Sequence, residues 1–229
     1  MTADFPLRRI RSFVRRDGRI TDAQRRAWDV SWPQFGLELK DGIINFQQVF
    51  QREAPRILEI GFGSGHSLLA MAALHPEQDF IGIETHQPGI GILLSGMEAQ
   101  AVSNIRIYYA DAVDVLNQCI ANQSLDVVQI FFPDPWPKRR HYKRRLIQPE
   151  FISLITSKLK PGGMLHLATD WQDYAKNMMQ VLTNEKHLSN LAGPGEFAAR
   201  SSQRPVMTKF ELRGQRSGFV IHELQFLKR

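Results

Sequence analysis

Residues 58–65 read LEIGFGSG, and this stretch decides the fold because it joins a short apolar run to a turn rich in glycine. The apolar run spans residues 56–60, and residues 68–74 follow with the spacing of a helix. Glycine tolerates unusual backbone angles and lets the main chain approach a ligand closely. The stretch therefore predicts a strand, a ligand-binding turn and a helix. The turn holds three glycines, Gly61, Gly63 and Gly65.

Strand-type and helix-type segments continue to alternate as far as about residue 170. Strands are expected at residues 80–83, 105–109, 125–132 and 164–168, and helices around 90–102 and 149–159. Strands separated by helical patterns of this length favour βαβ units, so the sequence predicts an α/β fold with a mostly parallel sheet. Residues 219–226 close the chain as a final strand, which we expect to pair antiparallel. We expect residues 51–229 to form this domain and residues 1–50 to form a basic appendage packed on it.

The composition is that of an ordinary globular chain, and it excludes several classes of protein. The 229 residues are 43% hydrophobic and 23% charged, and they contain no run of about 18 apolar residues that would span a membrane. Because Cys119 is the only cysteine, a disulfide scaffold and a multi-thiolate zinc site are excluded, and a reducing, cytoplasmic location is expected. The histidines lack ligand-like spacing, so we expect no metal.

The net charge of +6 is unevenly distributed along the chain. Residues 1–30 carry +4, residues 138–145 carry +6 and residues 200–229 carry +5, which leaves −9 for the rest. An acidic body with three basic patches is expected of a protein that binds a polyanion such as nucleic acid. A charge run can also be an ordinary solvated face, so the charges alone leave both interpretations open.

Three acids around the glycine turn favour one kind of cofactor. Glu59 lies inside the first strand, where a carboxylate would repel a pyrophosphate but suit an ammonium group. The glycine spacing also differs from that of a dinucleotide site or a P-loop. Glu84 and Asp111 end the next two strands, where carboxylates can reach ribose hydroxyls and an adenine amino group. Each could instead be a helix N-cap, but together the acids favour an enzyme dependent on S-adenosylmethionine (AdoMet).

The segment PDPWPK at residues 133–138 follows the most apolar strand of the sequence. Ligands of open α/β sheets bind at the carboxyl ends of the strands, so this segment should face the methyl donor. The prolines on either side of Asp134 restrict its backbone and aim its carboxylate, and Trp136 offers a flat surface for a purine. The alternative is a proline-rich turn before an exposed basic helix.

With these residues the sequence resembles the bacterial tRNA (guanine-N7)-methyltransferase family. The resemblance covers nearly the whole chain and rests on RSFVRRDGRIT at 11–21, LEIGFGSG at 58–65, FIGIE at 80–84, PDPWPKRRHYKRRL at 133–146, ATDW at 168–171 and TKFELRG at 208–214. It implies a Rossmann-like class I AdoMet-dependent methyltransferase fold with a seven-stranded sheet. Pro137 is a local difference from some relatives and is expected to stiffen its loop.

The resemblance also implies roles for individual residues. Asp134 resembles the family's proposed catalytic aspartate. The family's cofactor-contacting positions are matched in this sequence by residues that resemble them, namely Glu59, Gly61, Gly63, Gly65, Glu84 and Asp111. The family's substrate-contacting positions are matched in the same way by Lys138, Asp170, Thr208, Lys209, Phe210 and Glu211. The RNA-contacting segment resembles Arg139, Arg140, Lys143, Arg144 and Arg145.

The implied activity is transfer of a methyl group from AdoMet to N7 of guanosine 46 in the variable loop of tRNA, which gives 7-methylguanosine. Guanine N7 has a lone pair and no proton to remove, so positioning should dominate the rate. We expect tRNA as the partner, no obligate protein partner, and a monomer or weak homodimer. Two other hypotheses remain: a methyltransferase acting on another base atom, and a non-catalytic RNA-binding protein that kept the fold.

Overall fold

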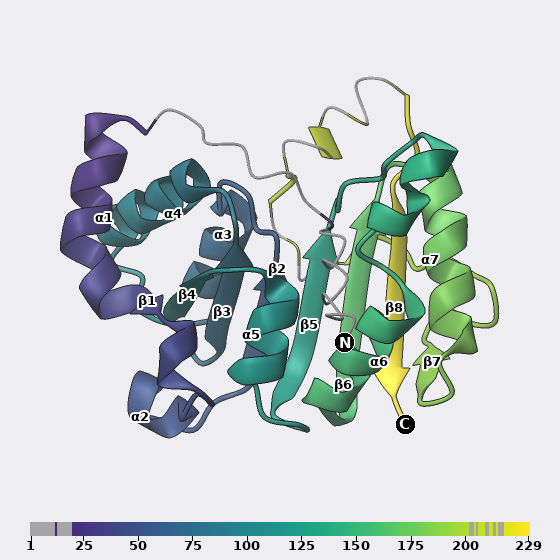
Figure 1. Cartoon of the computed structure of the whole chain (residues 1–229), viewed down its shortest axis with the longest axis horizontal. Helices are drawn as coiled ribbons and strands as arrows, with labels where there is room; N and C mark the ends of the chain where they lie inside the picture. Colours follow the sequence, from purple (N-terminus) through teal and green to yellow (C-terminus); the bar gives the residue numbers. More distant parts are fainter. Residues whose placement is uncertain are drawn as a thin grey trace, which may run out of the picture.

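The described part of the chain folds around one sheet with the strand order β1-β4-β3-β2-β5-β6-β8-β7 (Figure 1). This computed structural model describes residues 12, 20–201, 204, 206–208, 211, 212, 214 and 218–229. The strands are β1 (Gly36–Leu37), β2 (Arg56–Ile60), β3 (Asp79–Glu84), β4 (Ile105–Tyr109), β5 (Leu125–Phe131), β6 (Leu159–Thr169), β7 (Leu188–Asn190) and β8 (His222–Lys228).

All neighbouring strands from β1 to β6 pair in parallel, and β8 then lies antiparallel between β6 and β7. The expected α/β class, with a mostly parallel sheet and an antiparallel final strand, is confirmed. The final strand begins at His222 and not at residue 219. The sheet has eight strands because β1 joins its edge. With two and three residues, β1 and β7 are too short to show a period of two in the sequence.

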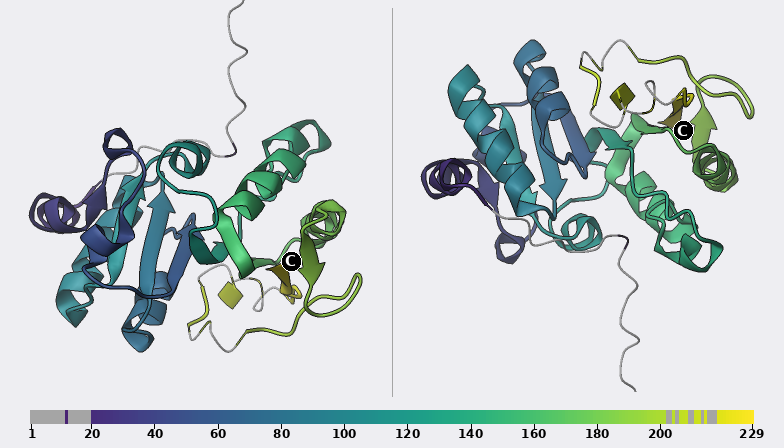
Figure 2. Two further views of the ribbon diagram at one scale, coloured as in Figure 1. Left: turned by 90° about the horizontal axis from the view of Figure 1, so that it is seen from below. Right: turned by 90° about the horizontal axis from the view of Figure 1, so that it is seen from above.

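Helices cover both faces of the sheet (Figure 2). On one face lie α1 (Asp22–Phe35), α3 (His66–Leu74) and α4 (Gln87–Gln100), and on the other lie α5 (Ala112–Gln118), α6 (Pro149–Lys158) and α7 (Gln172–Asn184). A short helix, α2 (Phe46–Phe50), and the 3-10 turns η1 (Leu39–Asp41) and η2 (Arg139–Arg144) complete the described elements. A sheet covered on both faces explains why its strands are apolar runs without alternation.

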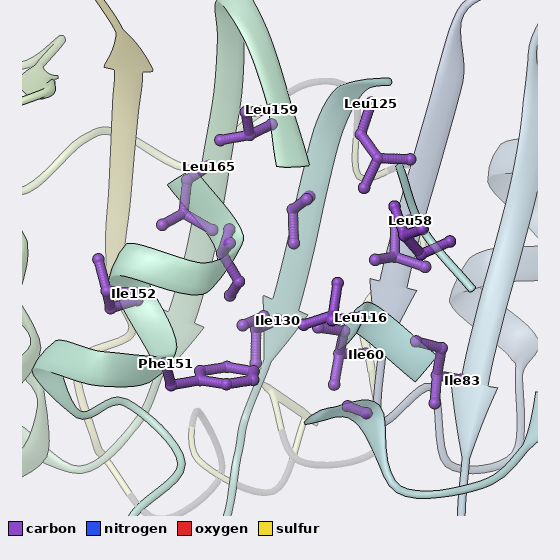
Figure 3. Packing of buried hydrophobic residues seen from close by; sticks show 14 of the residues in the cluster. Leu58, Ile60, Ile83, Leu116, Leu125, Ile130, Phe151, Ile152, Leu159 and Leu165 are labelled. Atoms are coloured by element: carbon purple, nitrogen blue, oxygen red, sulfur yellow. The ribbon is translucent and has the colours of Figure 1, made fainter. Parts of the chain in front are cut away.

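Two hydrophobic clusters, one on each face, hold the helices to the sheet. Leu58 and Ile60 of β2 face α5 and α6, where Leu116 and Phe151 pack against the same cluster (Figure 3). Ile57, their neighbour in β2, points to the opposite face and packs in the second cluster with residues of α3 and α4. Burial of alternate residues on opposite faces fixes the register of the central strand, because a shift by one residue would exchange the two faces.

The first described helix is closely packed on the rest of the fold. Thr21 begins α1 with a capping box, in which its side chain and that of Gln24 bond to each other's backbone N–H groups. The rings of Trp28 and Trp32 stack with centroids 4.3 Å apart, and Trp28 meets the edge of Tyr109 at 5.6 Å. Residues 22–37 therefore contribute a helix to one face and a strand to the edge of the sheet.

Because β2 to β6 are parallel, their carboxyl ends meet at one edge of the sheet. The residues that the sequence singles out leave the sheet at this edge: Gly61 after β2, Glu84 ending β3, Asp111 after β4, Asp134 after β5 and Asp170 after β6. No helix of the described residues is long and apolar enough to cross a membrane.

Candidate active site

The glycine turn after β2 presents open main chain. Gly61, Gly63 and Gly65 all have positive φ, at 77°, 60° and 73°, which L side chains rarely adopt. A Cβ atom placed on Gly61 or Gly63 would meet nothing within 4 Å, whereas one on Gly65 would collide with Leu93. The first two glycines therefore leave room for a ligand against the backbone, and Gly65 packs the start of α3 against α4.

The carboxylate of Glu84 ties the end of β3 to the glycine turn. Its Oε2 accepts a hydrogen bond of 2.7 Å from the backbone N–H of Gly63, and its Oε1 accepts bonds from the N–H groups of Thr85 and His86 at 2.6 and 2.9 Å. The Thr85 hydroxyl also bonds to Oε1, whereas Oε2 accepts only the bond from Gly63 and keeps capacity for a ligand hydroxyl. This cross-link was not anticipated from the sequence.

Glu59 is a buried acid with an unused oxygen. Its side chain is 3% exposed, and its Oε2 has no hydrogen-bond partner among the described residues. Burial raises the pKa of Glu59 to about 8, the charge of Arg204 opposes that rise, and the charge of Glu84 adds to it. A buried carboxyl with an unpartnered oxygen beside an open turn is suited to a cationic ligand group, because a buried charge is stable only when it is paired.

Asp111 is the N-cap of α5, and its Oδ1 accepts a hydrogen bond of 3.0 Å from the N–H of Val113. The helix-cap interpretation of this acid is therefore correct as far as its local structure goes. The carboxylate is only partly buried, at the same edge of the sheet as Glu59 and Glu84. Its expected contact with an adenine group stays a prediction.

The loop after β5 holds an unusual backbone. Phe132 donates its N–H to the carbonyl of Ala168 at 2.8 Å, which extends the pairing of β5 with β6 by one residue. Phe132 and Trp136 both have left-handed backbone angles, with φ of 51° and 45°. Such angles in large residues cost free energy and persist only where surrounding contacts hold them. Between these two residues, the side chain of Asp134 is exposed at the carboxyl edge of the sheet.

Contacts on both sides hold Trp136 in this loop. Its indole N–H donates to the carbonyl of Ser12 at 3.0 Å, and the guanidinium of Arg144 lies 5.0 Å from its ring centroid. The ring of His141 meets it edge-on at 5.6 Å. The flat face predicted to receive a purine is therefore shared with an arginine, and a hydrogen bond joins the loop to Ser12.

Arg145 differs from the other basic residues of its segment. It is 3% exposed, its Nε donates to the carbonyl of Pro135 at 2.9 Å, and its Nη2 pairs with Asp173 at 2.5 Å. Its guanidinium also lies 3.6 Å from the ring centroid of Tyr142 and 4.8 Å from that of Tyr174. Arg145 is therefore held inside the fold, and its expected contact with RNA stays a prediction. Arg139, Arg140 and Lys143 are exposed, and Arg144 is half-buried.

The late motif of the sequence is brought to the end of β6. A Cβ atom placed on Gly214 would lie 3.3 Å from Cβ of Asp170, so these two residues, one from each motif, are neighbours in space. A cavity of about 420 Å³ lies beside them, lined by residues 170–173 at the start of α7 and by residues 218–220 and 222. Lys138 is exposed at the start of η2, and Lys209 and Phe210 lie outside the described residues.

Glu211 was expected to contact substrate, but its carboxylate is bonded within the protein. The side chain is fully buried and pairs with Arg204 and, at 2.6 Å, with Arg200. Its backbone N–H donates to Oγ1 of Thr208 at 3.1 Å, and Glu211 and Leu212 are helical. In this conformation Glu211 organises the segment, and a direct contact with guanosine stays a prediction.

Two residues of the site were not identified from the sequence, Gly89 and Arg204. A Cβ atom on Gly89 would lie 2.0 Å from the carbonyl oxygen of Gly63, so α4 can approach the glycine turn only because residue 89 is glycine. Arg204 has no exposed surface and carries a buried charge behind the loop. No local pattern distinguishes either from other glycines and arginines, because both roles depend on partners distant in the sequence.

A family model described as "Putative methyltransferase" matches residues 53–224. Curated relatives named tRNA (guanine-N(7)-)-methyltransferase include one from Ectopseudomonas mendocina (strain ymp), 55% identical over 96% of this chain and 92% of the relative. Another, from Alcanivorax borkumensis, is 53% identical over 97% of this chain and 93% of the relative. A solved structure of the 16S rRNA methyltransferase KamB superposes with a TM-score of 0.58 at 13% identity, covering 80% of this chain and 92% of that one, which shows a shared fold.

Arg145→Ala should destabilise the fold by about 1–3 kcal/mol, because it removes the hydrogen bond to Pro135 and leaves that carbonyl unpaired. Asp173→Ala should cost less than about 1 kcal/mol, because the Asp173 side chain is 57% exposed and water can replace it. Urea unfolding of both variants measures the difference. Equal losses would show that the ion pair, and not the contact with the loop, is what Arg145 contributes.

Proposed function

Because the chain belongs to the tRNA (guanine-N(7)-)-methyltransferase family, we propose that it transfers a methyl group from AdoMet to N7 of guanosine 46 in the variable loop of tRNA. The observation that carries the proposal is the buried Glu59 carboxyl, whose Oε2 lacks a partner among the described residues, beside the open turn at Gly61 and Gly63. This arrangement fits a cofactor that is cationic and free of phosphate.

The residues present fit each part of AdoMet. Glu59 would hold the ammonium group, the backbone at Gly61 and Gly63 would lie against the amino-acid portion, and Glu84 would accept hydrogen bonds from the ribose hydroxyls. Asp111 would contact the adenine amino group. When bound, this cofactor supplies an electrophilic methyl group on a sulfonium.

The protein's own task is to position the base. Guanine N7 attacks through a lone pair and releases no proton, so the reaction needs no general base. Asp134 would accept hydrogen bonds from the N1–H and N2 amino donors of guanine and stabilise the positive charge that develops on the ring. The left-handed backbone at Phe132 and Trp136 supports this proposal, because it gives the loop that carries Asp134 a defined shape.

The RNA would be held around this centre by positive side chains. Lys138, Arg139, Arg140 and Lys143 follow Asp134 in the chain and are exposed, and Arg144 is half-buried over Trp136. Asp170 and the segment from Thr208 to Glu211 would complete the guanosine pocket. To reach N7 on the Hoogsteen edge in folded tRNA, the base would be partly extruded, as enzymes that modify bases generally require.

The test of this function is methylation of unmodified tRNA transcripts with labelled AdoMet. Label is expected as 7-methylguanosine with the natural transcript and is expected to be absent when guanosine 46 is replaced by adenosine. Asp134→Ala should reduce turnover at least about a hundredfold with little change in AdoMet affinity. Equal labelling of the substituted transcript would refute position 46, and a wild-type rate in the variant would remove Asp134 from catalysis.

Binding of AdoMet should release a proton from Glu59. With a pKa of about 8, this acid is mostly protonated at pH 7 in the free protein, and an ammonium group beside it favours the ionised form. We therefore expect affinity to rise by close to tenfold per pH unit between pH 6 and 7.5. Calorimetry at pH 7 in buffers of different ionisation enthalpy should show release of about one proton.

Glu59→Gln should abolish this proton release and lower AdoMet affinity, because the amide cannot ionise. Asp111→Asn is the matched control: it should weaken binding but leave the proton release unchanged. Release that persists in Glu59→Gln would assign the proton to another group.

Affinity for tRNA should fall steeply with salt, and the exposed basic residues should account for part of the slope. Changing Arg140, Lys143 and Arg144 to alanine together should reduce the slope of log K against log salt by about 2–3, because each phosphate contact contributes roughly 0.7–0.9. As a control, Lys186 is exposed after α7, where its neighbour His187 bonds to Arg229 at the end of the antiparallel β8, and its removal should change the slope little. An unchanged slope in the triple variant would place RNA elsewhere.

A further inference from the structure

A buried guanidinium lies where the parts of the candidate active site meet. Arg204 has no exposed surface, although it is charged at every physiological pH. A buried charge is tolerated only when it is paired and hydrogen-bonded, so its partners show which elements it holds together.

The first partners of Arg204 are two buried glutamates. Its Nη1 bonds to Glu223 of β8, and its Nη2 bonds to Glu211. Glu223 also accepts hydrogen bonds from Nε2 of His166 at 2.8 Å and from the N–H of Ser201 at 3.1 Å. Burial alone would raise the pKa of Glu223, but the bond with His166 and the charge of Arg204 hold it below its ordinary value. The guanidinium therefore joins the sheet to the TKFELRG segment.

The second set of partners is the strand end that carries Asp134. The central carbon of the guanidinium lies 4.6 Å from the ring centroid of Phe131 and 5.6 Å from that of Phe132. Phe132 has the left-handed backbone that starts the loop, two residues before Asp134. A cation over an aromatic face is attracted to it, and the contact is stronger in a buried site.

The guanidinium also acts on the cofactor end of the site without bonding to it. Its charge opposes the effect of burial on the pKa of Glu59. Both Nη atoms of Arg204 are already bonded to glutamates, and its Nε has no hydrogen-bond partner among the described residues. Arg204 therefore acts on Glu59 through its electrostatic field and forms no ion pair with the Glu59 carboxylate.

We propose that Arg204 is a positioning residue for methyl transfer: by stacking on Phe131 and Phe132 while bridging Glu211 and Glu223, it fixes the Asp134 loop relative to the guanosine segment. The proposal rests on the function proposed above. Arg204 is fully buried, so once AdoMet is saturating its effect on the rate should pass through the loop. Lysine cannot replace it, because a single ammonium does not present the planar fork that joins two carboxylates.

The test compares variants of Arg204 with a matched variant of Arg200. Arg200 pairs with the same Glu211 but is 35% exposed, and no contact of it with Phe131 or Phe132 is found among the described residues. At saturating AdoMet, Arg204→Met and Arg204→Lys should reduce kcat for tRNA about a hundredfold, with KM for tRNA changed less than about threefold. Arg200→Met should change kcat less than about threefold.

Loss of stability must be separated from loss of positioning, because Arg204→Met removes the guanidinium to which both buried acids, Glu211 and Glu223, are bonded. The double variant Arg204→Met/Glu223→Gln removes one of these acids and should regain thermal stability without regaining kcat. If turnover returns together with stability, or if Arg200→Met loses as much turnover as Arg204→Met, the role of Arg204 is structural and the proposal is overturned.

A readout without tRNA separates this proposal from the proposed function. Amide hydrogen exchange across residues 131–138 should accelerate in Arg204→Met and remain as in the wild type in Arg200→Met, whether or not the protein methylates tRNA. Unchanged exchange in Arg204→Met would overturn the positioning role. An inactive wild-type protein with the expected exchange pattern would instead refute only the proposed function.

Discussion

The parallel pairing of β2 with β3 on one side and with β5 on the other is the constraint on which the rest of the structure depends. Because these strands run in one direction, the glycine turn, the Glu84 carboxylate and the Asp134 loop leave the sheet at the same edge. Two hydrogen bonds then fix these exits to their neighbours: Gly63 to Glu84, and Phe132 to Ala168. The topology sets the position of the site, and the side chains at the exits set its chemistry.

Much of this arrangement could be predicted from the sequence, because it is encoded in local patterns. The glycine turn, the apolar run at 125–132 and the acids at the ends of β3 and β4 are recognisable without knowledge of any distant contact. The placement of Arg145 and Arg204 could not be predicted in this way. Within KRRHYKRR every arginine has the same local character, and two of the partners that set Arg145 apart, Asp173 and Tyr174, lie far along the chain. The roles of individual site residues toward cofactor and RNA stay predictions.

Burial separates the glutamates at this edge into two kinds. Glu211 and Glu223 are each paired with arginine, so their charges are compensated inside the fold. Glu59 is equally hidden from water, but its Oε2 has no hydrogen-bond partner among the described residues, and its pKa is raised to about 8. A compensated acid stabilises the fold, whereas an uncompensated one costs free energy until a cation arrives. The uncompensated acid is the one that lies beside the open glycine turn.

The position of Arg204 explains how these two kinds of acid can coexist. A guanidinium that bonded to Glu59 would satisfy it and leave no place for a cationic ligand. With both Nη atoms held by Glu211 and Glu223, Arg204 acts on Glu59 only through its field. That field opposes burial, so Glu59 titrates close to neutral pH, where an incoming ammonium group can displace its proton. The same guanidinium packs on Phe131 and Phe132 at the strand end that precedes Asp134. The pKa of Glu59 and the shape of the Asp134 loop therefore both depend on one buried charge.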